Sequence, residues 1–383
     1  DIEAIMNNGL AGIIPGQPFA IHPSPGNEAT DVLRDADLSW SAGAYAATHD
    51  VYVGESFEEV DAAAVPTASG LDVASFDPGR LELGKTYFWR VDEVNGAPDY
   101  TVFKGEVWSF TVEPFAYPIA GVIATSNASS DAGAGPENTV NGSGLNASDQ
   151  HSIAANDMWL TVLGQEGVYI QYEFDRVYKL HEMLVWNYNV QFEPVLGFGL
   201  KSVTIEYSEN GTDWTALGDV EFAKATAKAT YTANTTVGFG GVAAKYVRLS
   251  VSSGWGMLGQ YGLSEVRFLY IPTQPREPQP AGGATGVDPE TTLSWRRGRE
   301  AASHEVYLSM DPNALTLAGT VDSASFVPAL EFGSTYYWQI VEVNEADTVT
   351  AWAGDVWSFS TKEYALIEGF ETYDDDIDAG GLL

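Results

Sequence analysis

The stretch GKTYFW at residues 84–89 recurs as GSTYYW at residues 333–338, and this repeat decides the fold at both ends of the chain. Around the first copy, large apolar side chains occupy every second position, as in Tyr87, Trp89 and Val91. Alternation with a period of two residues is typical of a half-buried β-strand. We therefore expect both copies to be strands.

The repeat extends well beyond this stretch. LSW at residues 38–40 returns at 293–295, and WSF at residues 108–110 returns at 357–359. Self-similarity of this kind marks a duplicated structural module. Two copies of one module therefore flank a central segment that has a different sequence.

Each module contains several short strands, with a Trp near its start and a Tyr in a late strand. This pattern predicts a two-sheet β-sandwich with the aromatic residues in its core. The modules resemble fibronectin type III modules, in which Trp40 and Trp295 match the early core Trp and Tyr87 and Tyr336 match the late Tyr. The resemblance covers residues 18–113 and 275–362.

Each module also carries a histidine followed by an acidic residue, His49 before Asp50 and His304 before Glu305. A His–acid pair can serve in catalysis. Because the pair recurs at the same position of two modules, we interpret it as structural.

The central segment, residues 115–273, reads as a series of strands separated by turns. The expected strands are residues 168–174, 183–186, 202–208, 245–251 and 263–268, and the turns contain ENG at 209–211 and GFGG at 238–241. Regularly spaced short strands with Gly-rich turns indicate an all-β domain, and we expect a jelly roll. Trp159, Trp186 and Trp214 adjoin these strands and are expected in the core.

This segment resembles the discoidin domain, also called coagulation factor type C. The motifs that carry the resemblance are VNGSG (140–144), YIQYEF (169–174), VTIEYS (203–208), KYVR (245–248) and GLSEV (262–266). The resemblance implies a galactose-binding-like β-sandwich whose loops at one end hold a sugar. The whole arrangement is similar to multidomain secreted or surface proteins of planctomycete-type bacteria.

The fold class expected for the whole chain is therefore all-β, a jelly-roll sandwich flanked by two immunoglobulin-like sandwiches. The expected divisions are the tail of an upstream domain (1–14), a fibronectin type III-like module (15–114), the discoidin-like domain (115–273), a second fibronectin type III-like module (274–363) and the start of a next domain or a tail (364–383).

Two loops of the central segment combine aromatic rings with amides, the mixture that a sugar site needs. They are residues 187–193 and 252–261, and both look too polar and Gly-rich for the core. The candidate glycan-binding residues are Asn187, Asn189 and Trp255, joined by Tyr188, His151 and Gln191. Alternatively, Trp255 and Tyr188 pack beneath their own loops and His151 is an ordinary surface histidine.

The resemblance also implies a structural calcium ion. Calcium takes six to eight oxygen ligands from carboxylates and carbonyls. The candidate ligands are Asn138, Asn141, Ser143, Ser264 and Glu265. Where the family has Asp-Gly, this chain has Asn141-Gly142, which keeps an oxygen but loses a charge and should weaken the site.

The composition excludes several function classes. The chain has 18 Lys and Arg against 53 Asp and Glu, for a net charge of −35, which argues against binding to nucleic acid or to anionic membranes. It has no cysteine for disulfide or thiol chemistry, and no apolar run long enough to insert into a membrane. Of this charge, −7 belongs to the central segment.

No phosphate loop, catalytic triad order or zinc motif is present in the sequence, so we expect a fragment that is not an enzyme. The leading hypothesis is a secreted or cell-surface chain whose central domain binds a polysaccharide or other glycan, with the flanking modules as spacers. The alternative is a structural or adhesive role, in which the chain binds other cell-surface proteins or only maintains spacing.

Overall fold

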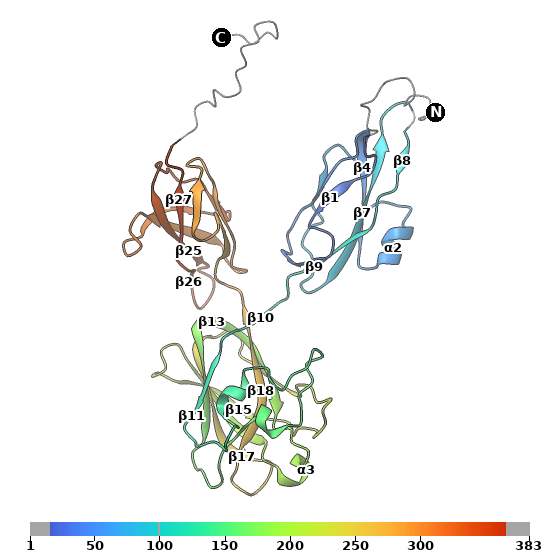
Figure 1. Cartoon of the computed structure of the whole chain (residues 1–383). Coiled ribbons are helices and arrows are strands. Elements are labelled where there is room, and N and C mark those ends of the chain that lie inside the picture. The colour runs from blue at the N-terminus through green and yellow to red at the C-terminus, as the bar shows by residue number, and fades with distance from the viewer. Residues whose placement is uncertain (1–15, 99, 365–383) are drawn as a thin grey trace, which may run out of the picture. The chain divides into compact units, whose positions relative to one another are not determined.

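The computed structural model describes residues 16–98 and 100–364, and it divides into two compact units, residues 1–115 and 116–383 (Figure 1). The prediction of an all-β chain is confirmed, since the elements are almost entirely strands. Within the described part, no helix is long and apolar enough to cross a membrane. The predicted upstream tail and the predicted C-terminal segment beyond residue 364 lie outside the described residues.

The first unit is a sandwich of two sheets. A three-stranded sheet has the order β1-β3-β6, and a larger sheet has the order β2-β9-β7-β4-β5 with β8 added to β7. The strands are β1 (Ile21–Ser24), β2 (Ala29–Val32), β3 (Leu38–Ser41), β4 (Ala46–Gly54), β5 (Ala68–Leu71), β6 (Ser75–Phe76), β7 (Thr86–Asn95), β8 (Val102–Phe103) and β9 (Trp108–Val112).

The C-terminal module of the second unit repeats this topology strand for strand. Its sheets have the orders β19-β21-β24 and β20-β27-β25-β22-β23, with β26 added to β25. The strands are β19 (Arg276–Gln279), β20 (Ala284–Val287), β21 (Leu293–Arg296), β22 (Ser303–Ser309), β23 (Thr316–Val321), β24 (Ser325–Phe326), β25 (Thr335–Val343), β26 (Ala351–Ala353) and β27 (Trp357–Thr361).

The two modules differ in the connection between their fourth and fifth strands. The first module places the short helix α2 (Phe57–Ala62) there, and Ser56 caps it by accepting a hydrogen bond from the backbone N–H of Glu59. Side-chain oxygens of serine commonly satisfy such free N–H groups at the first turn of a helix. The helix accounts for the different length of the two copies.

The same aromatic cluster fills both sandwiches. Trp89 packs on Trp108 with ring centroids 4.9 Å apart, and Trp338 packs on Trp357 at 4.8 Å. The hydroxyl of Tyr87 accepts a hydrogen bond from the backbone N–H of Glu82, five residues upstream, and Tyr336 does the same with Glu331. A tyrosine that bonds back to nearby backbone in this way is typical of immunoglobulin-like sandwiches.

The paired histidines also serve the sandwiches. His49 is buried and bonds through Nδ1 to Glu93, and His304 bonds in the same way to Glu342. The acid that follows each histidine in sequence is therefore not its partner. The second oxygen of each glutamate accepts a backbone N–H of its own module, so each pair ties a loop to the sheet.

The central domain is a jelly roll. Its strand path is β10-β18-β13-β17-β14-β15, with β11 and β16 paired to β13 and β12 paired to β18. The strands are β10 (Tyr117–Pro118), β11 (Ile123–Ser126), β12 (Trp159–Leu160), β13 (Tyr169–Asn187), β14 (Leu200–Ser208), β15 (Thr215–Glu221), β16 (Thr235–Gly238), β17 (Ala243–Gly254) and β18 (Gly262–Ile271). The short helices are η1 (Pro136–Thr139), η2 (Ala155–Asp157) and α3 (Glu193–Leu196).

One strand of the central domain is longer than expected. The two separate strands predicted at 168–174 and 183–186 are one continuous strand, β13, which changes register between Glu173 and Tyr178. Its first half pairs with β11 and β17 and its second half with β16 and β18. The two halves are joined by this register shift and not by a turn, so one strand pairs with all four neighbours.

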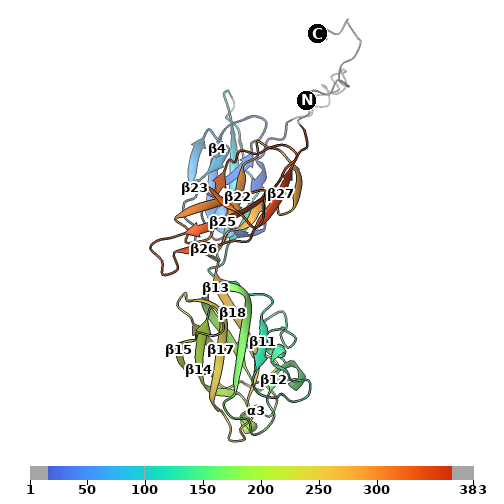
Figure 2. The same cartoon turned by 90° about the vertical axis from the view of Figure 1, so that its left-hand side faces the viewer.

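Of the three tryptophans predicted to lie in the core of the central domain, two are buried there. Trp159 and Trp186 are buried, whereas Trp214 is half-buried on the sheet surface beneath the guanidinium of Arg248, 3.8 Å from its ring centroid. Figures 1 and 2 show α3 and the long loops at one end of this domain, opposite the end where β10 lies and β18 leads into the C-terminal module.

Candidate functional site

The loops at the α3 end of the central domain are the place to test the sugar-site prediction. We name residues 188–199 and 255–261 the apical loops. The first connects β13 to β14 and contains α3, and the second connects β17 to β18. Backbone hydrogen bonds join them, from Trp255 to Gly199 at 3.0 Å and from Gly256 to Gly197 at 2.6 Å.

Glycine is required where the two apical loops meet. Gly197 has a φ of +66°, and a Cβ on it would lie 2.4 Å from the backbone N of Gly256. A Cβ on Gly256 would lie 2.1 Å from the carbonyl oxygen of Leu196. Any other residue at either position would push the loops apart, since real Cβ contacts are longer than this.

The side chain of Asn187 lies in the core, not at the surface. Its Nδ2 donates to the carbonyl oxygens of Leu200 at 2.7 Å and Ala223 at 2.9 Å. Its Oδ1 accepts the backbone N–H groups of Tyr188 at 2.9 Å and Leu200 at 3.0 Å. The amide thus closes the base of the first apical loop with four hydrogen bonds and has no room for a sugar.

Three further candidates are buried as well. Asn189 donates to the carbonyl oxygens of His151, Ser152 and Lys228, and Tyr188 is covered by Phe198. His151 is fully buried, with Nδ1 bonded to the Ser152 carbonyl. The expectation that this loop is too polar for the core is wrong, because its amides satisfy backbone groups that would otherwise be buried without partners.

The remaining two candidates reach solvent. Gln191 is exposed. Trp255 is half-buried: its indole N–H donates to the Phe222 carbonyl at 3.1 Å, and Lys201 Nζ lies 4.8 Å from its ring centroid. Both of these contacts are with residues outside the loop that carries Trp255.

The most exposed apolar residues of these loops are not among the residues predicted from sequence. Four of them lie on the apical loops, and we call them the apical apolar group: Phe192 (66% exposed), Val195 (84%), Met257 (98%) and Leu258 (54%). Large apolar side chains seldom gather in water without a partner. Their exposure could not be predicted from sequence, because a loop with the same residues could equally be buried.

Glu193 fixes the loop that presents Phe192. The Glu193 carboxylate is buried and accepts the backbone N–H groups of Phe198 at 3.0 Å and Gly199 at 2.9 Å. Burial raises the pKa of this carboxyl, and the two hydrogen bonds oppose that rise. The first apical loop is thus held from below while Phe192 points its apolar surface to solvent.

His151 gives the central domain a dependence on acid. Burial lowers the pKa of His151 below its ordinary value of 6.5. Near pH 6.5 and below, His151 takes up a proton more readily in the unfolded chain than in the folded domain. The contribution of neutral His151 to stability is therefore complete above that pH and is lost as the pH falls. We expect melting temperatures measured from about pH 7.5 to about pH 5.5 to fall more steeply for the native chain than for His151→Gln. Equal slopes would contradict this account.

The calcium candidates come together from two distant parts of the chain. Glu265, buried on β18, accepts the backbone N–H of Gly142 at 3.3 Å. Asn141 Oδ1 accepts the N–H of Ser143, and Asn141 Nδ2 donates to Oδ1 of Asn138. The loop of residues 138–143 therefore lies against the Glu265 carboxyl.

The carboxyl of Glu265 is buried, and the Gly142 N–H and the nearby Arg267 guanidinium favour its charged form. Burial raises the pKa of Glu265 to about 8. The hydroxyl of Ser264, also buried, has no hydrogen-bond partner among the described residues. No group of three or more His, Cys, Asp or Glu side chains suited to a metal occurs in the described part of the chain. The oxygens in this part of the chain are one carboxylate and several neutral groups, which are donor types that calcium takes.

Comparison with known proteins agrees with the jelly-roll fold. Residues 122–265 match the model of the F5/8 type C domain. A search of curated proteins found no match.

Three similar solved structures come from bacteria. CBM32-3 of a family 31 glycoside hydrolase from Clostridium perfringens is 17% identical over 41% of this chain and 95% of its own, with a TM-score of 0.32. The CBM32-1 and CBM32-2 domains of Clostridium perfringens ZmpB, in complex with GalNAc, are 13% identical over 40% of this chain and 34% of their own, with a TM-score of 0.32. An F5/8 type C domain from Bacteroides fragilis is 14% identical over 41% and 97%, with a TM-score of 0.32. Residues 122–265 of this chain are an F5/8 type C, or discoidin, domain.

Proposed function

We propose that the central domain binds a glycan on its apical loops and performs no catalysis. The observation that carries this proposal is an exposed aromatic ring, Phe192, next to an exposed amide, Gln191, on a loop that Glu193 and Asn187 fix from below. The apolar face of a sugar ring stacks on an aromatic side chain while amides bond its hydroxyls. Loops fixed in advance lose little entropy on binding.

The local charge at the apical loops favours this site over the rest of the acidic chain. Lys201 lies over Trp255, and Lys224 Nζ donates to the carbonyl oxygen of Pro194. These two cations give an anionic glycan an approach despite the net charge of −35. Neutral and anionic glycans are both compatible with this surface.

A glycan array with the whole chain tests the function, with GalNAc among the probes. We expect binding that Phe192→Ala weakens by about 2- to 10-fold, the value of one stacking contact. Val65→Ala, which removes an exposed apolar side chain from the N-terminal module, is the matched control and should bind like the native chain. No glycan bound at millimolar concentration, with or without calcium, would refute the proposal.

The apical apolar group also suits a second function, adhesion to a protein partner. Its four side chains are exposed on two loops that are hydrogen-bonded to each other, and exposed apolar residues that lie together mark protein contacts. The partners would then be other cell-surface proteins, and the domain would bind no sugar. The glycan array separates the two functions directly.

We further propose that calcium binds between Glu265 and the loop of residues 138–143. Glu265 would supply the carboxylate and Asn138, Asn141, Ser143 and Ser264 the neutral oxygens. The ion would neutralise a buried carboxylate and tie the loop to β18. Support comes from the burial of Glu265 and from the unpartnered hydroxyl of Ser264 among the described residues.

We propose that the flanking modules are fibronectin type III-like spacers in a secreted or cell-surface protein. The tyrosine hydrogen bonds of Tyr87 and Tyr336 and the repeated topology support this assignment. A chain of this kind hydrolyses nothing. Release of reducing ends from a polysaccharide incubated with the purified chain would overturn the non-catalytic part of the proposal.

A further inference from the structure

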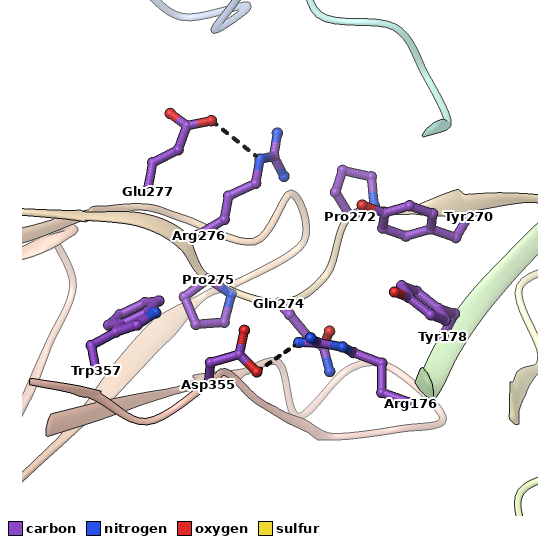
Figure 3. Close-up of a pocket in the computed structure, with 10 residues that line it drawn as sticks. All are labelled: Arg176, Tyr178, Tyr270, Pro272, Gln274, Pro275, Arg276, Glu277, Asp355 and Trp357. Carbon is purple, nitrogen blue, oxygen red and sulfur yellow. Dashed lines mark hydrogen bonds and ion pairs between the residues drawn. The ribbon is translucent and has the colours of Figure 1, made fainter. Parts of the chain in front are cut away.

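A second concave surface lies within the second unit, between the central domain and the C-terminal module. It encloses about 260 Å³ and is formed by the middle of β13, the end of β18, the segment that leads into β19, and the loop before β27 (Figure 3). Small-molecule sites typically enclose about 300–1,000 Å³, so this cleft suits one sugar-sized ring.

Ion pairs hold the cleft in shape. Lys179 Nζ donates to Glu300 and, at 2.5 Å, to Asp347 of the C-terminal module, and only 11% of its side chain is exposed. Arg176 Nη1 donates to Asp355 at 2.9 Å while its Nε donates to Asp175. The Lys179 pairs are largely shielded from water and are screened little by salt, whereas Arg176 and Asp355 are 37% and 61% exposed. The Lys179 pairs thus join the central domain to the C-terminal module beside the cleft.

The walls of the cleft are aromatic. Tyr178 and Tyr270 lie together on one side, with ring centroids 4.6 Å apart, and Trp357 lies on the opposite side (Figure 3). Tyr117 continues the row beyond Tyr270 at 6.1 Å. Pro275 and the Arg176–Asp355 pair lie between the tyrosines and Trp357 (Figure 3). The tyrosine rings offer a stacking surface to the apolar side of a flat or chair-shaped ligand.

The polar groups of the cleft are balanced in charge. Two arginines line it, and each has a carboxylate partner there: Arg176 bonds to Asp355, and Arg276 Nε lies 3.8 Å from Glu277. Gln274 adds an amide that can both donate and accept. A balanced set of donors and acceptors suits hydroxyl groups, which need both, better than it suits a charged ligand.

We propose that this junction cleft is a second carbohydrate site, for a single neutral hexose ring. The ring would lie against the tyrosine pair, with its hydroxyls bonded by Gln274, Arg176 and Asp355. The proposal does not rest on the apical loops, which lie at the other end of the central domain. It makes the intact chain a two-site binder.

Fluorine NMR of the whole chain labelled with 5-fluorotryptophan tests the proposal. Trp357→Phe and Trp255→Phe identify the resonances that report on the junction cleft and on the apical loops. The probes are D-glucose, D-galactose and D-mannose, with D-glucuronate as the charged comparison. We expect a neutral hexose to shift the Trp357 resonance in a saturable way.

Variants then separate the two sites. Gln274→Ala should weaken the response at Trp357 about 10-fold, because a ligand hydroxyl loses its partner. Phe192→Ala should leave that response unchanged. Thermal unfolding confirms that each variant is folded.

Three results would overturn the proposal for the junction cleft. They are no shift of the Trp357 resonance with any neutral hexose, a shift with glucuronate alone, or binding that Gln274→Ala leaves unchanged. A response at Trp255 without one at Trp357 refutes this inference and leaves the apical site standing. A response at Trp357, together with no glycan whose binding is weakened by Phe192→Ala, supports the junction cleft and refutes the apical site.

Discussion

Asn187→Ala is expected to lower the stability of the central domain by about 4 kcal/mol or more. The variant removes four hydrogen bonds, two to the N–H groups of Tyr188 and Leu200 and two to the carbonyls of Leu200 and Ala223. Each buried backbone group left without a partner costs about 1–3 kcal/mol. The total is a large part of the roughly 5–15 kcal/mol that stabilises a typical domain.

Hydrogen exchange measured by mass spectrometry isolates the effect in a chain of several modules. Peptides that cover the end of β13 and the start of β14 should exchange much faster in Asn187→Ala, while peptides of the N-terminal module should not change. Gln191→Ala is the matched control, since its exposed side chain lies four residues further along the same loop. It should change stability by less than about 0.5 kcal/mol.

The result also decides the role of Asn187. A variant with normal exchange that loses glycan binding would restore Asn187 as a direct ligand contact. A destabilised variant whose folded fraction still binds would establish that it positions the first apical loop.

Calcium is expected to raise the melting temperature of the central domain by about 5–10 °C when it is present at about 100 times its dissociation constant. Such an excess stabilises the folded state by about 2.7 kcal/mol. For a domain of this size each kcal/mol corresponds to roughly 2–4 °C. Differential scanning calorimetry of chelator-treated protein, before and after calcium addition, measures the shift.

Glu265→Gln should abolish the calcium shift, because it removes the one carboxylate of the proposed site. Glu221→Gln, which neutralises an exposed glutamate on β15, is the matched control and should keep the full shift. If calcium shifts the melting temperature of Glu265→Gln as much as that of the native chain, calcium binds at another site or acts without a specific site. Magnesium, which demands a tighter octahedral geometry, should produce a much smaller effect.

Much of the fold could be predicted from sequence because its signals are local. The alternation around Tyr87 and Trp89 and its recurrence at Tyr336 and Trp338 indicate strands without any knowledge of distant contacts. The discoidin motifs did the same for the central domain. A duplicated module also predicts its own topology, and the two strand orders are identical.

The residues of the site were harder to predict, because the exposure of a side chain depends on partners that are far away in sequence. Asn187 is buried by carbonyl groups 13 and 36 residues downstream, and Asn189 by groups 37 to 39 residues away. No local pattern distinguishes an amide that caps backbone from one that meets a sugar. Phe192 and Met257 show the opposite case. Apolar residues in a loop are usually expected to pack into the core, but these two are exposed.

The sequence by itself therefore determined the all-β class, the repeat, the discoidin domain and the regions where loops gather. Only the tertiary structure decided which loop residues face solvent, that β13 is one continuous strand, and that the Glu265 carboxyl accepts the backbone N–H of Gly142. The physical reason is that β-strand periodicity is a property of neighbouring residues. Burial and hydrogen-bond satisfaction are set by segments that meet only once the sheets have closed.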